Sequence, residues 1–359
     1  MLRIGLLTSG GDCQALNATM RGIVKTILNN AKEPVEIYGF EDGYQGLIYS
    51  RFRTMTWQDF SGVLTQGGTI LGTSRTPFKL LDTPGADGVE KVPAMLQTYH
   101  KLQLDCLFVL GGNGSTKTAR RLSDEGLNVI ALPKTIDNDT WGTDVTFGFP
   151  SAIDVATRYL DEIKTTASSH GRVFVVEIMG HKVGWIPLSA GIAGGADVIL
   201  IPEIPYDIDN VIKAIEKRNA DGGRFAIVAV AEGAISKEEA ALPKKEYKKA
   251  LAKRAEKYPS IAYALAEQIA KTGREVRVGI PGHTQRGGRP DAEDRIFATQ
   301  CGVEAARGCL EGKFGYMIAK VNNKMCRVPL KEVADKLKYV DPKSDLVREA
   351  KLLGISFGD

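Results

Sequence analysis

The sequence predicts an α/β protein made of two Rossmann-like, three-layer αβα domains with mainly parallel sheets. Continuous apolar runs of strand length recur along the chain and alternate with segments of helical periodicity. Several of these runs end in glycine-rich or acidic turns, as the strand-to-helix connections of parallel sheets do. A chain of 359 residues that is 43% hydrophobic is also long enough for two domains with large cores.

The composition excludes several classes of function. A formal net charge of +4, from 47 basic and 43 acidic residues, is too small to indicate nucleic-acid binding. No apolar run approaches the roughly 20 residues of a membrane helix, and residues 1–7 predict a first strand rather than a signal peptide. The cysteines are odd in number and show no metal-ligand spacing, which predicts reduced thiols in a cytoplasmic protein. They are Cys13, Cys106, Cys301, Cys309 and Cys326.

Two glycine turns follow predicted strands. The apolar residues 2–9 lead into the sequence SGGD at 9–12 and then into a helical pattern. The apolar residues 105–110 lead into GGNGS at 111–115 and another helical pattern. A strand, a glycine turn and a helix together offer backbone N–H groups to a phosphate, although the same turn can serve simple helix entry.

A third glycine-rich loop, GGTILGTSR at 67–75, ends in Arg75 and is also interpreted as following a strand. Three such loops favour a crevice that binds a nucleotide or a polyphosphate.

The sequence PKTIDND at 133–139 follows the apolar run 128–132 and carries two carboxylates, Asp137 and Asp139. Because ligands of open α/β sheets bind outside the carboxyl ends of the strands, both acids would face a crevice. One could take a proton from a substrate hydroxyl while the other holds a metal, as phosphoryl transfer requires. The alternative is an Asx-rich turn that only closes the strand.

The second half continues the alternation, with strands expected at 173–179, 198–201 and 225–231, the last delivering Glu232 at its end. Glycines at 191–196 suggest close helix packing. Eight lysines and arginines at 236–258 are interpreted as a solvated helical face rather than an anion site.

A glycine-rich block at 279–288 carries His283 and Arg286, three residues apart. Small neighbours would let both side chains donate to one phosphate, although such a pair alone is also typical of a surface turn.

Taken in order, these motifs resemble those of the 6-phosphofructokinases over essentially the whole chain. The matching positions are 8–12, 68–75, 111–115, 134–139, 179–180, 232 and 282–288.

The resemblance implies transfer of the terminal phosphoryl group of ATP to the 1-hydroxyl of fructose 6-phosphate, with Mg²⁺. It implies that Asp137 is the general base, that Thr135 lies beside the transferring phosphoryl group, and that Arg75 meets transition-state charge. The implied donor contacts are Gly11, Tyr44, Arg75, Asn113, Gly114, Ser115 and Lys134, with Tyr44 against the adenine. The implied sugar-phosphate contacts are Thr135, Asp137, Arg172, Met179, Gly180, Glu232, Arg277, His283 and Arg286. The implied metal-side residues are Asn113 and Asp139.

The resemblance also implies a domain division and an assembly. The donor domain would comprise 1–148 plus about 285–335, and the sugar-phosphate domain 149–284 plus about 336–359, with the active site in the cleft between them. Arg172 and Arg277 resemble arginines that a neighbouring subunit lends to the sugar phosphate. A homo-oligomer, usually a tetramer, is therefore expected.

Two markers disagree on the phosphoryl donor. Glycine at position 114 is usual in ATP-using members, because it leaves room for the nucleotide. Lysine at position 134 is usual in pyrophosphate-using members. We give Gly114 more weight, because a flexible lysine can swing aside or bind an ATP phosphate. A pyrophosphate-dependent enzyme is the alternative.

Other departures leave details open. Asn113 replaces the family's usual aspartate, Gln14 and Ala15 replace its Pro-Gly pair, and His181 replaces an arginine. These changes motivate a second alternative, a non-catalytic sugar-phosphate sensor. Three basic residues resemble an effector site but are equally typical of exposed helix charges; they are Arg21, Lys25 and Lys164.

Overall fold

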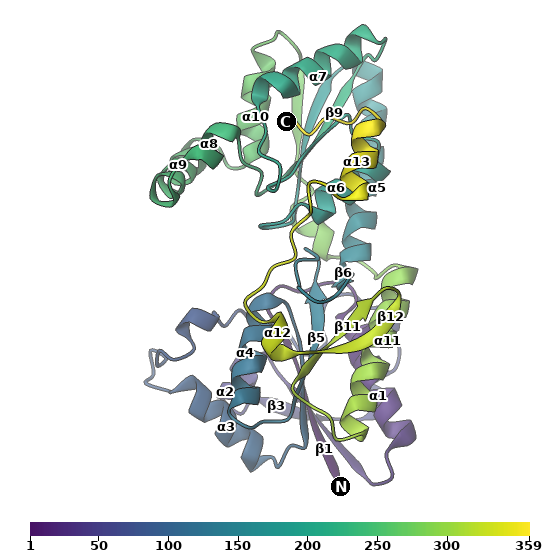
Figure 1. The fold of residues 1–359 in the computed structure, drawn as a ribbon. Coiled ribbons are helices and arrows are strands. Elements are labelled where there is room, and N and C mark those ends of the chain that lie inside the picture. Colours follow the sequence, from purple (N-terminus) through teal and green to yellow (C-terminus); the bar gives the residue numbers. More distant parts are fainter. The chain divides into compact units, whose positions relative to one another are not determined.

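The structure, a computed structural model, describes all 359 residues. The chain divides into two compact units (Figure 1). Unit 1 comprises Met1–Ser151 and Arg286–Lys338, and unit 2 comprises Ala152–Gln285 and Tyr339–Asp359. Each unit is an α/β body with a mainly parallel sheet, so the predicted fold class is confirmed.

Unit 1 contains an eight-stranded sheet with the order β12-β11-β5-β4-β1-β2-β3, and β6 pairs with β5. The central pairs are parallel, whereas β2–β3 and β11–β12 are antiparallel. The strands are β1 (Leu2–Ser9), β2 (Val35–Phe40), β3 (Phe52–Met55), β4 (Cys106–Gly111), β5 (Val129–Thr135), β6 (Phe147–Gly148), β11 (Tyr316–Val321) and β12 (Lys324–Pro329). The helices are α1 (Leu16–Asn30), α2 (Tyr44–Ile48), α3 (Lys91–Lys101), α4 (Asn113–Asp124), α11 (Ala292–Leu310) and α12 (Leu330–Val333).

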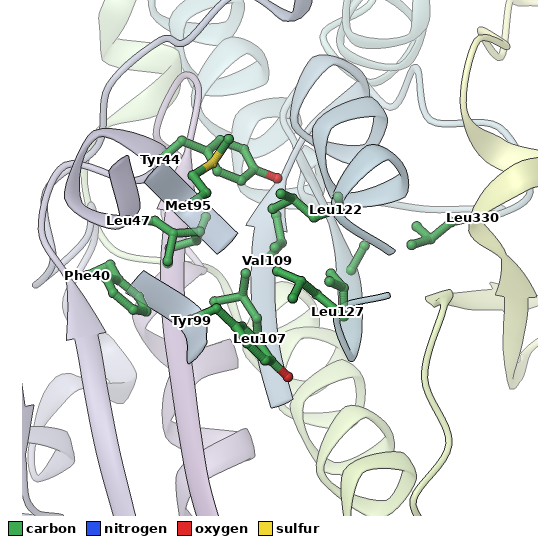
Figure 2. Close-up of a cluster of buried hydrophobic side chains, with 14 of the residues drawn as sticks. Phe40, Tyr44, Leu47, Met95, Tyr99, Leu107, Val109, Leu122, Leu127 and Leu330 are labelled. Atoms are coloured by element: carbon green, nitrogen blue, oxygen red, sulfur yellow. The ribbon is translucent and has the colours of Figure 1, made fainter. Parts of the chain in front are cut away.

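Helices cover both faces of this sheet. On one face, side chains of α2, α3 and α4 pack against those of β1, β4 and β5 to form the cluster in Figure 2. On the other face, α1 and α11 pack backbone against backbone, because a Cβ added at Gly302 would meet the carbonyl oxygen of Thr19 at 2.4 Å. Large apolar side chains therefore fill the first face, while Gly302 lets the two helices of the second face approach each other closely.

One expectation about this unit is wrong. Residues 67–75 do not follow a strand, because the chain makes short 3₁₀ turns at Trp57–Phe60 and Val63–Thr65 before them. The first turn is stabilised by a capping box between Thr56 and Asp59. A local hydrogen-bonding motif here overrides the alternation of strand and loop.

Unit 2 contains a four-stranded, fully parallel sheet with the order β10-β7-β9-β8. The strands are β7 (Val173–Ile178), β8 (Val198–Leu200), β9 (Ala226–Ala231) and β10 (Val276–Gly279). The helices are α5 (Phe149–His170), which begins in unit 1, α6 (Trp185–Ala193), α7 (Ile208–Ala220), α8 (Lys237–Ala241), α9 (Lys244–Lys257), α10 (Ile261–Ala270) and α13 (Asp345–Leu352).

Two further predictions for unit 2 are confirmed. A Cβ at Gly191 would lie 2.7 Å from the side chain of Ile199, so α6 packs closely on β8. Helix α9 buries none of its residues, as a solvated basic helix should.

No helix in the chain is long and apolar enough to span a membrane, and all five cysteines are free.

Candidate active site

In unit 1, three turns open at the carboxyl ends of adjacent strands. The register pairs Ser9 with Gly111, and Gly111 with Pro133, so β1, β4 and β5 end side by side. The strand order reverses between β1 and β4, since β2 lies on one side of β1 and β4 on the other. Ligands of open α/β sheets bind at such a switch point.

Two cations lie on the first glycine turn. The side chain of Lys134 is only 3% exposed, and its ammonium group donates a hydrogen bond to the carbonyl oxygen of Gly11. The guanidinium Nη1 of Arg286 donates to the carbonyl oxygen of Asp12 at 3.0 Å. A Cβ added at Gly11 would lie 2.8 Å from that Nη1, so a larger residue at position 11 would displace the guanidinium from its present place. Burial lowers the pKa of Lys134, while nearby Cys13 raises it.

The resemblance implies that Arg286 meets the sugar phosphate; in this structure its guanidinium lies on the glycine turn at 10–12. A cation at this position can serve a donor phosphate without any change in the backbone.

The loop at 67–75 is tied to the same turn. The N–H of Gly10 donates to the carbonyl oxygen of Ser74 at 3.0 Å, and the Thr73 hydroxyl donates to the Gly10 carbonyl at 2.8 Å. These bonds bring the exposed Arg75 next to the glycine turn. Asn17 on α1 bonds the loop at the carbonyl of Gln66 and the amide of Ile70. Sequence reasoning missed Asn17, because an asparagine within a helical pattern carries no sign of a distant loop.

The third element of this edge is the start of α4. Its N-cap residue Gly112 provides no side-chain cap, so the first N–H groups of the helix are available to an anion. Gly114 is exposed, and a Cβ built on it would meet nothing within 4 Å. The side-chain amide of Asn113 donates through Nδ2 to the carbonyl oxygen of Lys336 at 3.1 Å.

Tyr44 does not lie where the resemblance implies, against an adenine. Its ring is 0% exposed within the core cluster, and its hydroxyl donates to the carbonyl oxygen of Ser115 at 2.8 Å (Figure 2). No face of the ring is available to an adenine in this structure. The pattern Asp-Gly-Tyr-Gln-Gly matches in sequence, but the tyrosine supports the first turn of α4 through the Ser115 carbonyl.

The acidic turn is held by its middle residue. Asn138, between Asp137 and Asp139, adopts a φ of 54°, a conformation that asparagine tolerates better than most residues. Its Oδ1 accepts from the N–H of Thr146 at 3.1 Å and from the ammonium of Lys338 at 2.8 Å. The left-handed preference of asparagine could have marked Asn138 in advance.

At the start of the same turn, the hydroxyl of Thr135 accepts from the N–H of Asp137 at 3.1 Å. Burial lowers the pKa of Lys338 to about 8, while Asp144 and Asp139 raise it. No sequence pattern marks Lys338 as a support of the turn.

In unit 2, a carboxylate caps the turn after β7. Oε1 of Glu232 accepts from the backbone N–H groups of Gly180 at 3.2 Å and of His181 at 2.7 Å. The N–H of Met179 donates to Oε1 of Gln285 at 3.2 Å. Met179, Gly180 and Glu232 therefore lie together at the carboxyl ends of the paired strands β7 and β9.

Gln285 is a residue that sequence reasoning missed. It is 0% exposed and also donates to the carbonyl oxygen of Gly282, within the 3₁₀ turn Gly282–Arg286 that carries His283. His181 itself is exposed and adopts a φ of 52°.

Arg172 and Arg277 lie elsewhere in unit 2. Arg172 directly precedes β7, and Arg277 pairs with Phe174 near the beginning of that strand. Both guanidinium groups pair with one carboxylate, that of Glu275, at 2.9 Å for Arg172. The six residues of β7, or roughly 23 Å of extended chain, separate Arg172 from Met179. The structure does not bring these arginines together with Met179, Gly180 and Glu232 within one chain.

Comparisons with known proteins show which family this chain belongs to. A family model described as phosphofructokinase matches residues 3–309. The chain belongs to the phosphofructokinase family. It is 50% identical to the ATP-dependent 6-phosphofructokinase of Spirochaeta thermophila, over 99% of this chain and 97% of that protein. It is 44% identical to ATP-dependent 6-phosphofructokinase 3 of Bacteroides thetaiotaomicron, over 99% of this chain and all of that protein.

Solved phosphofructokinases have the same fold. The Pichia pastoris phosphofructokinase in the T-state matches with a TM-score of 0.78 and 32% identity. That match covers 92% of this chain but only 35% of the yeast chain. A pyrophosphate-dependent phosphofructokinase from Nitrosospira multiformis matches with a TM-score of 0.82 at 20% identity, which speaks for the fold alone.

This phosphofructokinase contains no group of three histidine, cysteine or acidic side chains that could hold a metal by themselves. The oxygen groups that the resemblance implies for a metal are the carboxylate of Asp139 and the side-chain carbonyl of Asn113, both in unit 1. Magnesium usually takes one or two protein oxygens and completes its shell with phosphate oxygens and water. The residues present therefore fit a metal that arrives with a polyphosphate.

Two of the three positions that resemble an effector site have partners of their own. The ammonium of Lys25 lies 4.6 Å from the ring centroid of Trp57, and that of Lys164 donates to the carbonyl oxygen of Gly194 at 3.3 Å. These contacts are those of ordinary surface residues, and we assign no regulatory role to them.

Proposed function

We propose that this phosphofructokinase transfers the terminal phosphoryl group of ATP to the 1-hydroxyl of fructose 6-phosphate, which yields fructose 1,6-bisphosphate. The observation that carries the proposal is the arrangement at one sheet edge of unit 1. A glycine turn with two cations, Lys134 and Arg286, lies beside a turn with two carboxylates, Asp137 and Asp139. Relatives that match the full chain at 44% and 50% identity are named ATP-dependent 6-phosphofructokinase, which supports ATP as the donor.

In this proposal Asp137 accepts the proton of the sugar 1-hydroxyl as the oxygen attacks the phosphorus. Thr135, whose hydroxyl already bonds the N–H of Asp137, lies beside the transferring phosphoryl group. Arg75 balances the negative charge that develops on that group.

Gly11, Ser115 and the amide end of α4 bind the donor phosphates together with Lys134 and Arg286. Gly114 leaves the space that a nucleotide requires. Tyr44 is not part of the donor site, because its ring is buried.

Magnesium would be held by Asp139 and by Oδ1 of Asn113, together with oxygens of the donor. When bound, it neutralises part of the phosphate charge. The amide of Asn113 supports this assignment, because its nitrogen donates to Lys336 and its oxygen remains the group that can face a cation.

Met179, Gly180, Glu232 and His283 form the sugar pocket, with Glu232 already fixed by two backbone amides. Arg172 and Arg277 of a second copy complete it, because their own chain holds them at the opposite ends of the strands. A homo-oligomer, with a tetramer as the expected form, follows from this requirement.

The pyrophosphate-dependent alternative rests on one observation, the buried ammonium of Lys134 on the donor turn. A cation there suits either donor, whereas the open space at Gly114 has a use only for a nucleotide. We therefore retain ATP. The free cysteines support a location in a reducing compartment, and we propose the cytoplasm.

The deciding experiment measures formation of fructose 1,6-bisphosphate at steady state, with magnesium and with ATP or pyrophosphate in parallel. Turnover with ATP alone is expected, and turnover with pyrophosphate alone would refute the proposed donor. Asp137→Ser should lower kcat by about 10² to 10⁴ with little change in fructose 6-phosphate binding. A sensor without catalysis would bind the sugar phosphate and turn over neither donor.

A further inference from the structure

A short segment near the C-terminus touches both halves of the candidate metal site. Residues 335–338 (DKLK), here called the strap, follow α12 within unit 1. At the strap's start, the carboxylate of Asp335 pairs with Lys117 at 2.7 Å and with Arg120 at 3.5 Å, both on α4. At its end, the N–H of Lys338 donates to the carbonyl oxygen of Asp139 at 2.9 Å. The strap thus connects α4 to the acidic turn.

The side chain of Lys338 adds a second connection to the acidic turn. Its ammonium donates to Oδ1 of Asn138 at 2.8 Å, to the carbonyl of Thr143 at 2.9 Å and to the carbonyl of Asp144 at 2.8 Å. These acceptors engage all three donors of an ammonium group. Asn138 adopts a left-handed backbone conformation between Asp137 and Asp139, so it sets the directions of these two carboxylates. Because Lys338 holds Asn138, it also helps to fix those directions.

The middle of the strap sets the direction of Asn113. The carbonyl oxygen of Lys336 accepts from Nδ2 of Asn113 at 3.1 Å. An aspartate at position 113 would place a carboxylate oxygen against that carbonyl, and two acceptors at this distance repel. The asparagine that departs from the usual pattern therefore matches the strap carbonyl beside it.

We propose that the strap is a positioning element for the metal side of the active site. The carbonyl of Lys336 and the ammonium of Lys338 set the geometry of Asn113 and of the Asp137–Asp139 turn, and through them the strength of metal binding. This inference rests on the proposed function, because it concerns the magnesium that would accompany the donor.

The first test removes the ammonium in Lys338→Met, with Lys331→Met as a control for an exposed lysine on α12. Binding of Mn²⁺ with a non-hydrolysable ATP analogue, followed by electron paramagnetic resonance, should weaken at least tenfold. The half-saturating Mg²⁺ concentration for turnover should rise by a similar factor, while the KM for fructose 6-phosphate stays within twofold. Amide hydrogen exchange should quicken at 137–144. Unchanged Mn²⁺ affinity in a folded variant overturns the proposal.

The second test is Asn113→Asp, which leaves Lys338 in place. A freely oriented carboxylate would tighten Mn²⁺ binding, because it adds a negative charge. The strap predicts weaker binding, because the carboxylate is repelled by the Lys336 carbonyl. Tighter binding therefore refutes the inference even if Lys338→Met fails to fold. If wild-type protein turns over neither donor but the Mn²⁺ and exchange results hold, the proposed reaction fails while the positioning role stands.

Discussion

The ammonium group of Lys134 donates a hydrogen bond to the backbone carbonyl oxygen of Gly11, so a buried cation is fixed beneath the first glycine turn. The contact is to backbone and therefore does not depend on which donor is bound. A positive charge at this depth favours any phosphate chain that lies on the turn.

Replacement of this lysine separates its effect on binding from donor choice. In Lys134→Gly we expect the KM for ATP to rise about tenfold, since the attraction between the buried ammonium and the donor phosphates, about 1.4 kcal/mol, is lost. The kcat with ATP should fall by less than about threefold. Pyrophosphate should support no turnover before or after the change. Steady-state kinetics with both donors provide the measurement, and pyrophosphate activity that disappears in the variant would favour the alternative donor.

The open space at Gly114 allows a test in which a charge is added rather than removed. In Gly114→Asp the fold should be unaffected, because a Cβ there meets no atom within 4 Å. The new carboxylate would repel the donor phosphates and reduce kcat/KM for ATP by at least about 100-fold, or about 2.7 kcal/mol. Gly114→Ala is the matched control and should retain most activity. Equal losses in the two variants would mean that volume, not charge, matters.

The role of the buried Tyr44 can be tested by removing its hydroxyl group alone. Tyr44→Phe removes the hydroxyl that bonds the Ser115 carbonyl and should lower the free energy of unfolding by about 1 kcal/mol. The KM for ATP should stay within twofold, because the ring does not face the donor. Urea unfolding and ATP kinetics measure the two effects. A large rise in KM with unchanged stability would restore the expected contact with adenine.

A buried carboxylate predicts how stability depends on pH. Asp294, 0% exposed, accepts from the N–H of Gly148 at 2.9 Å and from the Ser151 hydroxyl at 2.6 Å. Burial raises its pKa to about 7 from an ordinary 3.8. Since the folded state then binds the proton more tightly than the unfolded state, this group's contribution to stability is lost as pH rises from about 4 to about 7.

In Asp294→Asn this loss should vanish. The difference in unfolding free energy between wild type and variant should change by up to about 4 kcal/mol between pH 4 and pH 8, in favour of the variant at high pH. Urea unfolding of both proteins at several pH values gives the difference. Parallel curves would show that the hydrogen bonds from Gly148 and Ser151 keep the carboxylate ionised throughout.

The parts of the fold that could be predicted are those whose sequences are continuous apolar runs. Strands β1, β4, β7 and β9 were expected at nearly their observed positions, because buried parallel strands need continuous apolar sequence. The edge strands β3 and β12 were not predicted, since polar and partly exposed residues interrupt their pattern, and β11 was missed although its first four residues are buried.

The candidate site also has parts that could be predicted from the sequence and parts that could not. The glycine turns and the acidic turn could be located, because glycine and aspartate carry local constraints. The support from Lys338 could not be predicted, since a lysine in a polar tail looks like any surface lysine. The partner of Asn113 could not be predicted either, because it is a backbone carbonyl, which every residue has.

The division of the chain has a consequence for how such a gene can change. The chain passes from unit 1 to unit 2 after Ser151, returns after Gln285 and leaves again after Lys338. Neither unit corresponds to one uninterrupted stretch of coding sequence. A single recombination event therefore cannot exchange one unit for that of a relative, and a premature stop codon in the last 21 residues truncates unit 2 although its sheet is already complete.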